Sequence, residues 1–344
     1  MEFNTKLLSA NSTNDIEAAA ELLRAGLPVG LPTETVYGLA ANALSPRAVA
    51  TIFAAKRRPA DNPLIVHVTG IAQASTLVTE IPDLAAELMA TFWPGPLTLI
   101  LPKKAKVPDA VTAGRGDVGL RAPAHPAFQA VLQQCGFPLA APSANPAGQP
   151  SPTTAQHVFT ELNGIIPVVL DGGPCLVGVE STVLSLTGKM PRLLRPGGVT
   201  VEQIQRITGP IQIDAAITTQ LDPDVAPAAP GMKYRHYAPQ TPIAIFTGTP
   251  NQALAYLQRH SGENIGVLGF DDDAETFTNY PFISYGSRHD ASAQARQLFA
   301  ALHQLDSLQA DRIIAFAPPT DSGVALAVHN RLNKAAGFNH ISVK

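Results

Sequence analysis

The first part of the chain consists of short apolar runs that mix irregularly with amphipathic segments. Runs such as Leu64-Ile65-Val66 are short, continuous and bounded by turn residues, which predicts buried strands. Segments that repeat apolar residues every three or four positions predict helices. Because the two kinds do not alternate strictly, we expect an α/β fold with an open, twisted, mixed sheet and helices against it. The expected strands are 27–31, 63–68, 97–101, 118–121, 138–141, 168–170 and 181–186, and the expected helices are 15–25, 84–92, 126–134, 153–162 and 201–207, with another that begins at Pro46 after the N-cap residue Ser45.

Beyond residue 242 the pattern becomes regular, with strands and helices in turn. This order predicts a smaller Rossmann-like α/β domain. Gly337 is expected to end the last helix, because glycine adopts the left-handed backbone of a helix C-terminus. The expected strands are 243–246, 265–270, 282–285 and 312–317, and the expected helices begin near Pro250 and span 290–308 before the last one.

A proline-rich stretch separates these two patterns. Residues 221–242 contain five of the 31 prolines, and the whole chain has about 9% proline where about 5% is usual. We therefore expect one domain over 1–213, a semi-extended spacer over 214–242 and a second domain over 243–344. The centre of the spacer, Lys233 to Tyr237, is both basic and aromatic, which predicts that the spacer closes over a bound ligand as a lid.

Composition excludes several classes of protein. Charged residues are 15% of the chain, the 24 basic and 27 acidic side chains give a net charge of −3, and 45% of the residues are apolar. These values exclude a disordered chain and a protein that grips nucleic acid by bulk charge. The two cysteines, Cys135 and Cys175, lack the spacing of a zinc site and predict reduced thiols. With no leader pattern and no run long enough to span a membrane, we expect a cytoplasmic protein.

The chain lacks the common nucleotide-binding and nucleophile motifs. Gly114 to Gly119 satisfies GxGxxG, but a strand follows it where a dinucleotide-binding glycine loop needs a helix, so we expect an ordinary loop. Neither a GxxxxGK[ST] phosphate loop nor a GxSxG nucleophile motif is present. The run Asp271 to Asp273 is expected to be a solvated loop, and no metal-binding residue is predicted.

The helix that begins at Pro46 ends in a lysine that its pattern places on the buried side. Val49, Ile52 and Phe53 form its apolar stripe, and the next position of that stripe is Lys56. A buried ammonium group is costly unless an anion meets it, so we expect Lys56 to face an anionic ligand, with Arg58 beside it. Arg57 is expected only to complement the helix dipole.

Polar residues also stand where other expected segments end. Ser143 and Asn145 follow the strand 138–141, His67 ends an apolar run, and Arg195 ends a later one. Open α/β sheets bind ligands at strand ends. An ordinary Ser/Asn turn before Pro146 explains Ser143 and Asn145 equally well. These residues therefore predict a site without specifying its chemistry.

A series of motifs in fixed order resembles the YrdC/YwlC family. The linker Pro230 to Pro239 and Asn330-Arg331-Leu332 are similar to the longer, two-domain branch of that family. The shared motifs are PTETVYGL at 32–39, KRRP at 56–59, NPL at 62–64, FWPGPLT at 92–98, RAPAHP at 121–126, PSAN at 142–145 and ESTV at 180–183.

The resemblance implies a YrdC-like fold over 1–213 and L-threonylcarbamoyladenylate synthase activity. Such an enzyme makes threonylcarbamoyl-AMP and pyrophosphate from L-threonine, bicarbonate and ATP. Partner enzymes then transfer the threonylcarbamoyl group to the tRNA adenosine next to the anticodon. This chemistry needs anion neutralisation and positioning but no protein nucleophile. Mg²⁺ is expected to be held mainly by the ATP phosphates.

The resemblance also implies roles for individual residues. The catalytic tetrad maps to Lys56, Arg58, Ser143 and Asn145. The threonine site maps to Thr35, His67, Arg121 and Ser181, where the Arg121 guanidinium suits a carboxylate. The ATP site maps to Arg58, Asn62, Ser143, Ser151, Arg195, Tyr234 and His236.

Two alternatives share related domains. One is an RNA-binding or ribosome-assembly module with a YrdC-like fold, against which the 15 basic and 15 acidic residues of 1–213 argue. The other is a carbamoyl-transferring hydrogenase-maturation protein, which the two isolated cysteines exclude. Direct binding of tRNA or of the transferring complex is left open.

Overall fold

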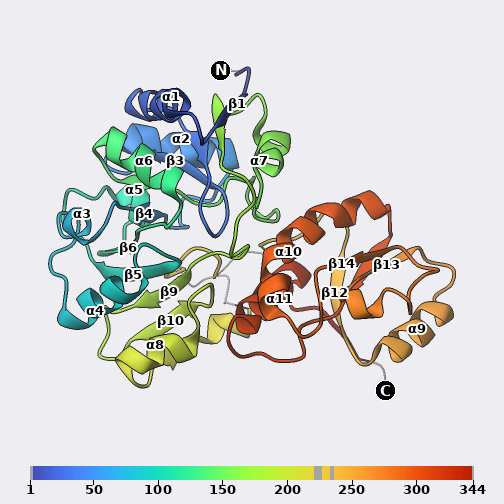
Figure 1. The fold of residues 1–344 in the computed structure, drawn as a ribbon. Coiled ribbons are helices and arrows are strands. Elements are labelled where there is room, and N and C mark those ends of the chain that lie inside the picture. The colour runs from blue at the N-terminus through green and yellow to red at the C-terminus, as the bar shows by residue number, and fades with distance from the viewer. Residues whose placement is uncertain (1–2, 221–226, 233–235, 343–344) are drawn as a thin grey trace.

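The computed structural model describes residues 3–220, 227–232 and 236–342, and these residues form two sheets (Figure 1). The larger sheet takes its strands from residues 6–213 and the smaller from residues 243–342. The expected spacer lies between these two sets of strands in the sequence. The exact bounds of the two domains stay a prediction.

The larger sheet is open and mixed. Its order is β1-β8-β2-β3-β7-β4-β6-β5-β9-β10-β11. Antiparallel pairs such as β2–β3 and β5–β6 alternate with parallel pairs such as β4–β6 and β5–β9. The strands are β1 (Lys6–Ser9), β2 (Val29–Leu31), β3 (Gly38–Asn42), β4 (Ile65–His67), β5 (Leu97–Pro102), β6 (Asp117–Arg121), β7 (Leu139–Ala140), β8 (Val168–Asp171), β9 (Thr182–Ser185), β10 (Arg192–Arg195) and β11 (Gln212–Ile213).

Helices cover this sheet, and one of them carries Lys56. The side chain of Ser45 caps α2 by accepting a hydrogen bond from the Ala48 amide, and Pro46 is its first residue. The helix ends where Arg57 adopts a left-handed φ of 51°, so Lys56 is its last residue. The helices are α1 (Thr13–Arg24), α2 (Pro46–Lys56), α3 (Ile71–Ala74), α4 (Asp83–Phe92), α5 (Asp109–Thr112), α6 (Pro126–Cys135), α7 (Ala155–Leu162) and α8 (Val201–Thr208).

The smaller sheet is parallel throughout, in the order β14-β13-β15-β12-β16. A parallel sheet that carries helices is the Rossmann-like arrangement that the regular pattern predicted. Gly337, at a left-handed φ of 59°, ends the last helix as expected. The strands of this sheet and the helices between them are β12 (Ile243–Thr247), α9 (Pro250–Arg259), β13 (Ile265–Gly269), β14 (Phe282–Ser284), α10 (Ala291–Gln304), β15 (Arg312–Ala315), α11 (Ala325–Ala336) and β16 (His340–Ser342).

Some details of the sequence interpretation were wrong or incomplete. Strand β3 was not predicted, because its Gly, Leu, Ala and Asn residues lack the branched and aromatic side chains that favour strands. The run Asp271–Asp273 is a 3₁₀ turn and not simply a solvated loop, since Asp273 is buried and pairs with Arg288 at 2.5 Å. The GxGxxG match lies in the loop before β6 and at the start of that strand, as expected.

The two parts pack closely against each other through α10 and α11, which lie on the side of the smaller sheet that faces the larger one (Figure 1). Val36 and Val179 from the first part, and Tyr237 from the spacer, join the apolar core of the second part. The Tyr237 ring lies 5.2 Å from that of Phe299 on α10. Gly178, at φ +79°, lies directly against the α10 backbone.

Gly178→Ala is expected to loosen this contact, because a Cβ there would overlap the backbone of Ala295 and Arg296. Overpacking of this kind costs about 1–3 kcal/mol, in addition to about 1–2 kcal/mol for a left-handed alanine. Gly173→Ala is the matched control, since Gly173 has φ +80° and an added Cβ would meet nothing within 4 Å. Urea unfolding measures both free energies, and equal losses in the two variants would contradict the close contact.

Candidate active site

Two adjoining cavities gather most of the polar residues that the sequence singles out. One has a volume of about 60 Å³ and the other about 210 Å³. Arg58, Ser143 and His236 line both, so we treat them as one site, the basic cleft. Its charged and polar lining consists of Lys56, Arg57, Arg58, Asn62, His67, Arg121, Ser143, Asn145, Glu180, Ser181, Arg195 and His236.

Two predicted residues among the described ones do not line these cavities. Thr35 is fully buried, and its hydroxyl lies 2.8 Å from that of Thr33. Ser151 is fully buried as well and donates to Glu180. Tyr234 lies outside the described residues.

Lys56 is buried as its place on the α2 stripe predicted, but its partners in the structure are main-chain carbonyls. The residue is 1% exposed, and its ammonium group donates to the carbonyl oxygens of Ser143 and Asn145. Lys56 therefore connects the turn after β7 to the end of α2 by hydrogen bonds. Burial, and secondarily the charge of Arg58, hold the pKa of Lys56 well below its usual value.

The turn that Lys56 holds presents an unused acceptor to the cleft. The Asn145 amide nitrogen donates to the carbonyls of Pro146 and Gln149 at 2.8 and 2.9 Å. Its Oδ1 atom is buried without a hydrogen-bond partner, as is Oδ1 of Asn62. Buried polar atoms are almost always satisfied in proteins, so these two oxygens suit a ligand that supplies donors.

Arg58 follows α2 and is held by the main chain. Its Nε donates to the Asn62 carbonyl at 3.2 Å and its Nη2 to the Pro63 carbonyl at 2.8 Å. These two carbonyl oxygens orient the guanidinium at the edge of the cleft.

His67 and Arg121 end the paired strands β4 and β6 and face each other in register. Arg121 is buried, donates to Oε1 of Glu34 at 2.6 Å, and reaches the Gly95 carbonyl at 3.3 Å. Burial, with the Arg121 charge, lowers the pKa of His67 to about 3, so its imidazole is neutral at physiological pH. The Nδ1 atom of His67 is buried without a partner.

A second cluster surrounds Ser181. Arg195 donates to the Ser181 carbonyl at 3.1 Å and to its hydroxyl at 3.2 Å, and that hydroxyl lies 2.8 Å from Thr98. Beside it, Glu180 accepts from the Ser151 hydroxyl at 2.6 Å and from Arg331 of α11 at 2.7 Å. Burial alone would raise the pKa of Glu180, but Arg331 and Arg195 lower it to about 2.

Two acidic residues of the site were missed by sequence reasoning. Glu34 and Glu180 stand inside the quoted motifs PTETVYGL and ESTV, which was the available signal. Their buried arginine partners are 87 and 151 residues away along the chain, so no local pattern could pair them.

Comparison with known proteins supplies the family. A family model described as "Telomere recombination" matches residues 21–197, and one described as "Threonylcarbamoyl-AMP synthase, C-terminal domain" matches residues 199–337. The chain is 48% identical to the threonylcarbamoyl-AMP synthase of Bacillus subtilis, covering 95% of this chain and 94% of that one. The chain belongs to the threonylcarbamoyl-AMP synthase family.

More distant members agree with this assignment. The threonylcarbamoyl-AMP synthase of Schizosaccharomyces pombe is 38% identical, covering 93% of this chain and 88% of that one. The crystal structure of P. abyssi Sua5 complexed with L-threonine superposes with a TM-score of 0.89 at 41% identity, covering 99% of both chains. The expected family, fold class and synthase function are thereby confirmed.

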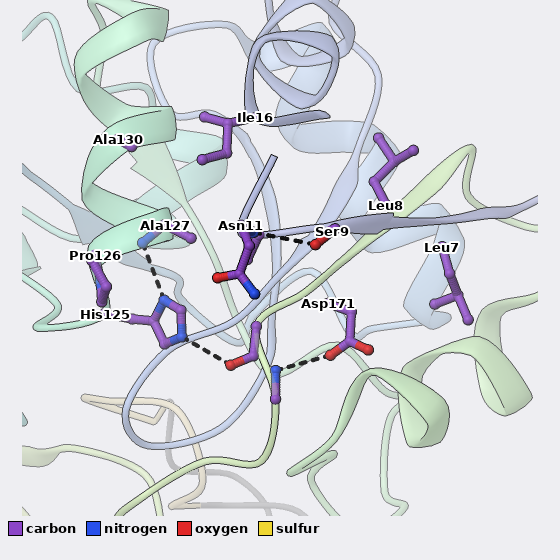
Figure 2. A pocket seen from close by; sticks show the side chains of 13 residues that line it. Leu7, Leu8, Ser9, Asn11, Ile16, His125, Pro126, Ala127, Ala130 and Asp171 are labelled. Carbon is purple, nitrogen blue, oxygen red and sulfur yellow. Dashed lines mark hydrogen bonds between the residues drawn. The ribbon is translucent and has the colours of Figure 1, made fainter. Parts of the chain in front are cut away.

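A larger cavity shares no lining residue with the basic cleft. It measures about 850 Å³ and lies between α1 and α6, beside the ends of β1 and β8 (Figure 2). Its polar groups serve the local backbone: His125 accepts from the Ala127 amide at 3.2 Å, and Asp171 accepts from the Gly173 amide at 2.9 Å. It contains none of the site residues that the family resemblance implies.

Over 3–220, 227–232 and 236–342, no group of three or more His, Cys, Asp or Glu side chains could hold a metal ion. Within the same ranges, no helix is long and apolar enough to cross a membrane.

A neutral histidine–carboxyl contact joins α7 to α10 behind the cleft. Nδ1 of His303 lies 3.4 Å from Oε1 of Glu161, and its ring centroid lies 4.3 Å from that of His157. Burial raises the pKa of Glu161 to about 8, against a smaller opposite effect of Lys56. Burial also lowers the pKa of His303 to about 4, so both groups are mainly uncharged at neutral pH.

Glu161→Gln is expected to flatten the pH dependence of stability. Because the folded pKa of Glu161 lies above its unfolded value of 4.5, the folded state binds more protons, and stability falls as pH rises from about 4.5 to 8. The slope reaches up to about 1.4 kcal/mol per pH unit. Urea unfolding of wild type and variant between pH 5 and 8 measures how the free energy of unfolding depends on pH. The same pH dependence in both proteins would contradict the raised pKa.

Proposed function

We propose that the chain makes threonylcarbamoyl-AMP in the basic cleft, from L-threonine, bicarbonate and ATP. The observation that carries this proposal is the charge of the lining. Among the described residues of its lining, five basic side chains, Lys56, Arg57, Arg58, Arg121 and Arg195, share the cleft with one carboxylate, that of Glu180. Such a lining suits a polyanionic substrate.

The chemistry requires positioning more than covalent catalysis. The threonine amine and bicarbonate give N-carboxythreonine, whose carboxylate oxygen attacks the α-phosphorus of ATP. An oxygen–phosphorus bond forms to the AMP moiety, and the bond to the leaving pyrophosphate breaks. We assign Lys56 and Arg58 to the phosphates and the carbamate, and the Ser143 hydroxyl and Asn145 amide to orientation of the reacting groups.

We assign the threonine moiety to the end of the cleft beside β4 and β6. Arg121 would bind the amino-acid carboxylate through the part of its guanidinium that Glu34 does not use. The neutral His67, with its unpartnered Nδ1, would contact the threonine without adding charge. Thr35 and Ser181 complete the assigned set, with Thr35 acting from behind the cavity wall.

ATP would occupy the rest of the cleft, against Asn62, Arg195 and His236. Ser151 is assigned to the same site through its hydrogen bond to Glu180, and Tyr234, also assigned to ATP, lies outside the described residues. Mg²⁺ dehydrates reluctantly, so it would keep mostly phosphate and water oxygens as ligands. This fits the cleft, because the described residues offer no cluster of carboxylates that could hold the ion. From the protein, the unpartnered Oδ1 of Asn145 would face the Mg²⁺ ion. When bound, Mg²⁺ neutralises phosphate charge.

We further propose that the product is passed to a tRNA-modifying partner complex in the cytoplasm. Threonylcarbamoyl-AMP is a mixed anhydride of a carbamic and a phosphoric acid. It can therefore transfer its acyl group to the adenosine next to the tRNA anticodon.

Arg58→Gln is expected to reduce formation of threonylcarbamoyl-AMP by about 10–150-fold, because a hydrogen bond to a charged group contributes about 1.5–3 kcal/mol. Mass spectrometry of the product from ATP, L-threonine and ¹³C-bicarbonate measures it and shows whether bicarbonate supplies the carbamoyl carbon. Arg47→Gln, on the exposed side of α2, the helix that Arg58 follows, is the control and should retain wild-type turnover. An Arg58→Gln variant as active as this control would contradict the site assignment.

The spacer is proposed to act as a lid over this site. Of its described residues, Pro230, Gly231, His236 and Tyr237 line the cleft. ATP together with L-threonine should therefore slow limited proteolysis within 214–242 by burying it further. Equal cleavage rates with and without the two substrates would count against the lid.

A further inference from the structure

The Rossmann-like part reaches the basic cleft through one buried arginine. Arg331 lies on α11, is 0% exposed, and donates from Nε to Oε2 of Glu180 at 2.7 Å. Its Nη1 donates to the Pro196 carbonyl at 3.0 Å and to Oδ1 of Asn330 at 2.9 Å. The guanidinium is thus held from both parts of the chain.

Glu180 connects Arg331 to two residues of the proposed ATP site. Its other oxygen, Oε1, accepts from the Ser151 hydroxyl at 2.6 Å. Arg195 is the second cation that acts on this carboxylate, yet the hydrogen bonds of Arg195 go to Ser181 and to the Pro230 carbonyl. Arg331 therefore provides the ion pair that Arg195 would otherwise supply.

Removing Arg331 would change the charge of the cleft as well as the contact between domains. A buried carboxylate without its partner is strongly unfavourable. Arg195, held beside Glu180, is the cation placed to compensate it. Arg195 would then pair with Glu180, and its positive charge would attract a phosphate group in the cleft less strongly.

We propose that Arg331 is a positioning residue for nucleotide binding: it neutralises Glu180 so that Glu180 orients Ser151 while Arg195 keeps its charge for the anionic ligand. This inference rests on the proposed function for the identity of the ligand, ATP. It gives the second domain a direct electrostatic part in the site of the first.

The decisive comparison is between two variants that break the same ion pair from opposite sides. Arg331→Met leaves Glu180 unpaired and should weaken ATP binding, measured by titration calorimetry on the whole protein, by about tenfold, equivalent to 1.4 kcal/mol. Glu180→Gln leaves Arg195 fully charged and keeps an amide oxygen for Ser151, so it should lose clearly less ATP affinity than Arg331→Met does. The double variant Glu180→Gln/Arg331→Met should recover most of the loss.

A purely structural role for Arg331 predicts a different result. Both single variants would then lose thermal stability and ATP affinity in parallel, which would overturn the proposal, as would wild-type affinity in Arg331→Met. Arg192→Met, which removes the Arg192–Asp214 ion pair outside the cleft, is the control and should leave ATP affinity unchanged. If Arg331→Met does not fold, a loss of ATP affinity of about tenfold or more in Glu180→Gln alone is sufficient to overturn the proposal.

Failure of the proposed function would be seen separately. Wild-type protein that binds ATP but yields no threonylcarbamoyl-AMP by mass spectrometry contradicts the synthase site. The comparison of ATP affinities between the Glu180 and Arg331 variants would still decide the role of Arg331.

Discussion

The buried ion pair between Glu180 and Arg331 is the contact on which the arrangement of the two parts depends. Removing two charges from water is costly, and their attraction compensates only when the geometry is good and the remaining polar atoms are bonded. Here the Ser151 hydroxyl takes the second carboxylate oxygen, and the Pro196 carbonyl and Asn330 take part of the guanidinium. One buried cluster thus joins the second part of the chain to the cleft in the first.

A chain with few charged residues still builds a basic cleft, in which main-chain carbonyls hold some of the cations while Arg121 is paired with Glu34. Lys56 donates to the carbonyls of Ser143 and Asn145, and Arg58 to those of Asn62 and Pro63. Carbonyl dipoles stabilise and orient a cation but leave its net charge in place. The near-neutral composition therefore excluded a protein that binds by bulk charge without excluding an anionic substrate.

Sequence reasoning succeeded where local patterns determine the outcome. The apolar stripe of α2 placed Lys56 on the buried face, and short apolar runs gave most central strands. It could not find β3, whose small residues resemble no strand pattern, or the pairing of Glu34 with Arg121 and of Glu180 with Arg331, which depends on tertiary packing. The contacts of Lys56 with two carbonyls were not predicted either, because they arise where the turn after β7 folds back onto the end of α2. The anionic ligand expected at Lys56 stays a prediction.

The two buried contacts between the domains respond to pH in opposite directions. Glu180 has a lowered pKa of about 2, so its contribution to stability is present above its unfolded value near 4.5 and is lost as pH falls toward 2. Glu161, with its pKa raised to about 8, favours the folded state when protonated, and this contribution declines as pH rises through that range. Arg331 acts through the contact that stays charged at neutral pH. The interface therefore keeps its ionic contact under the conditions in which the neutral contact at His303 begins to weaken.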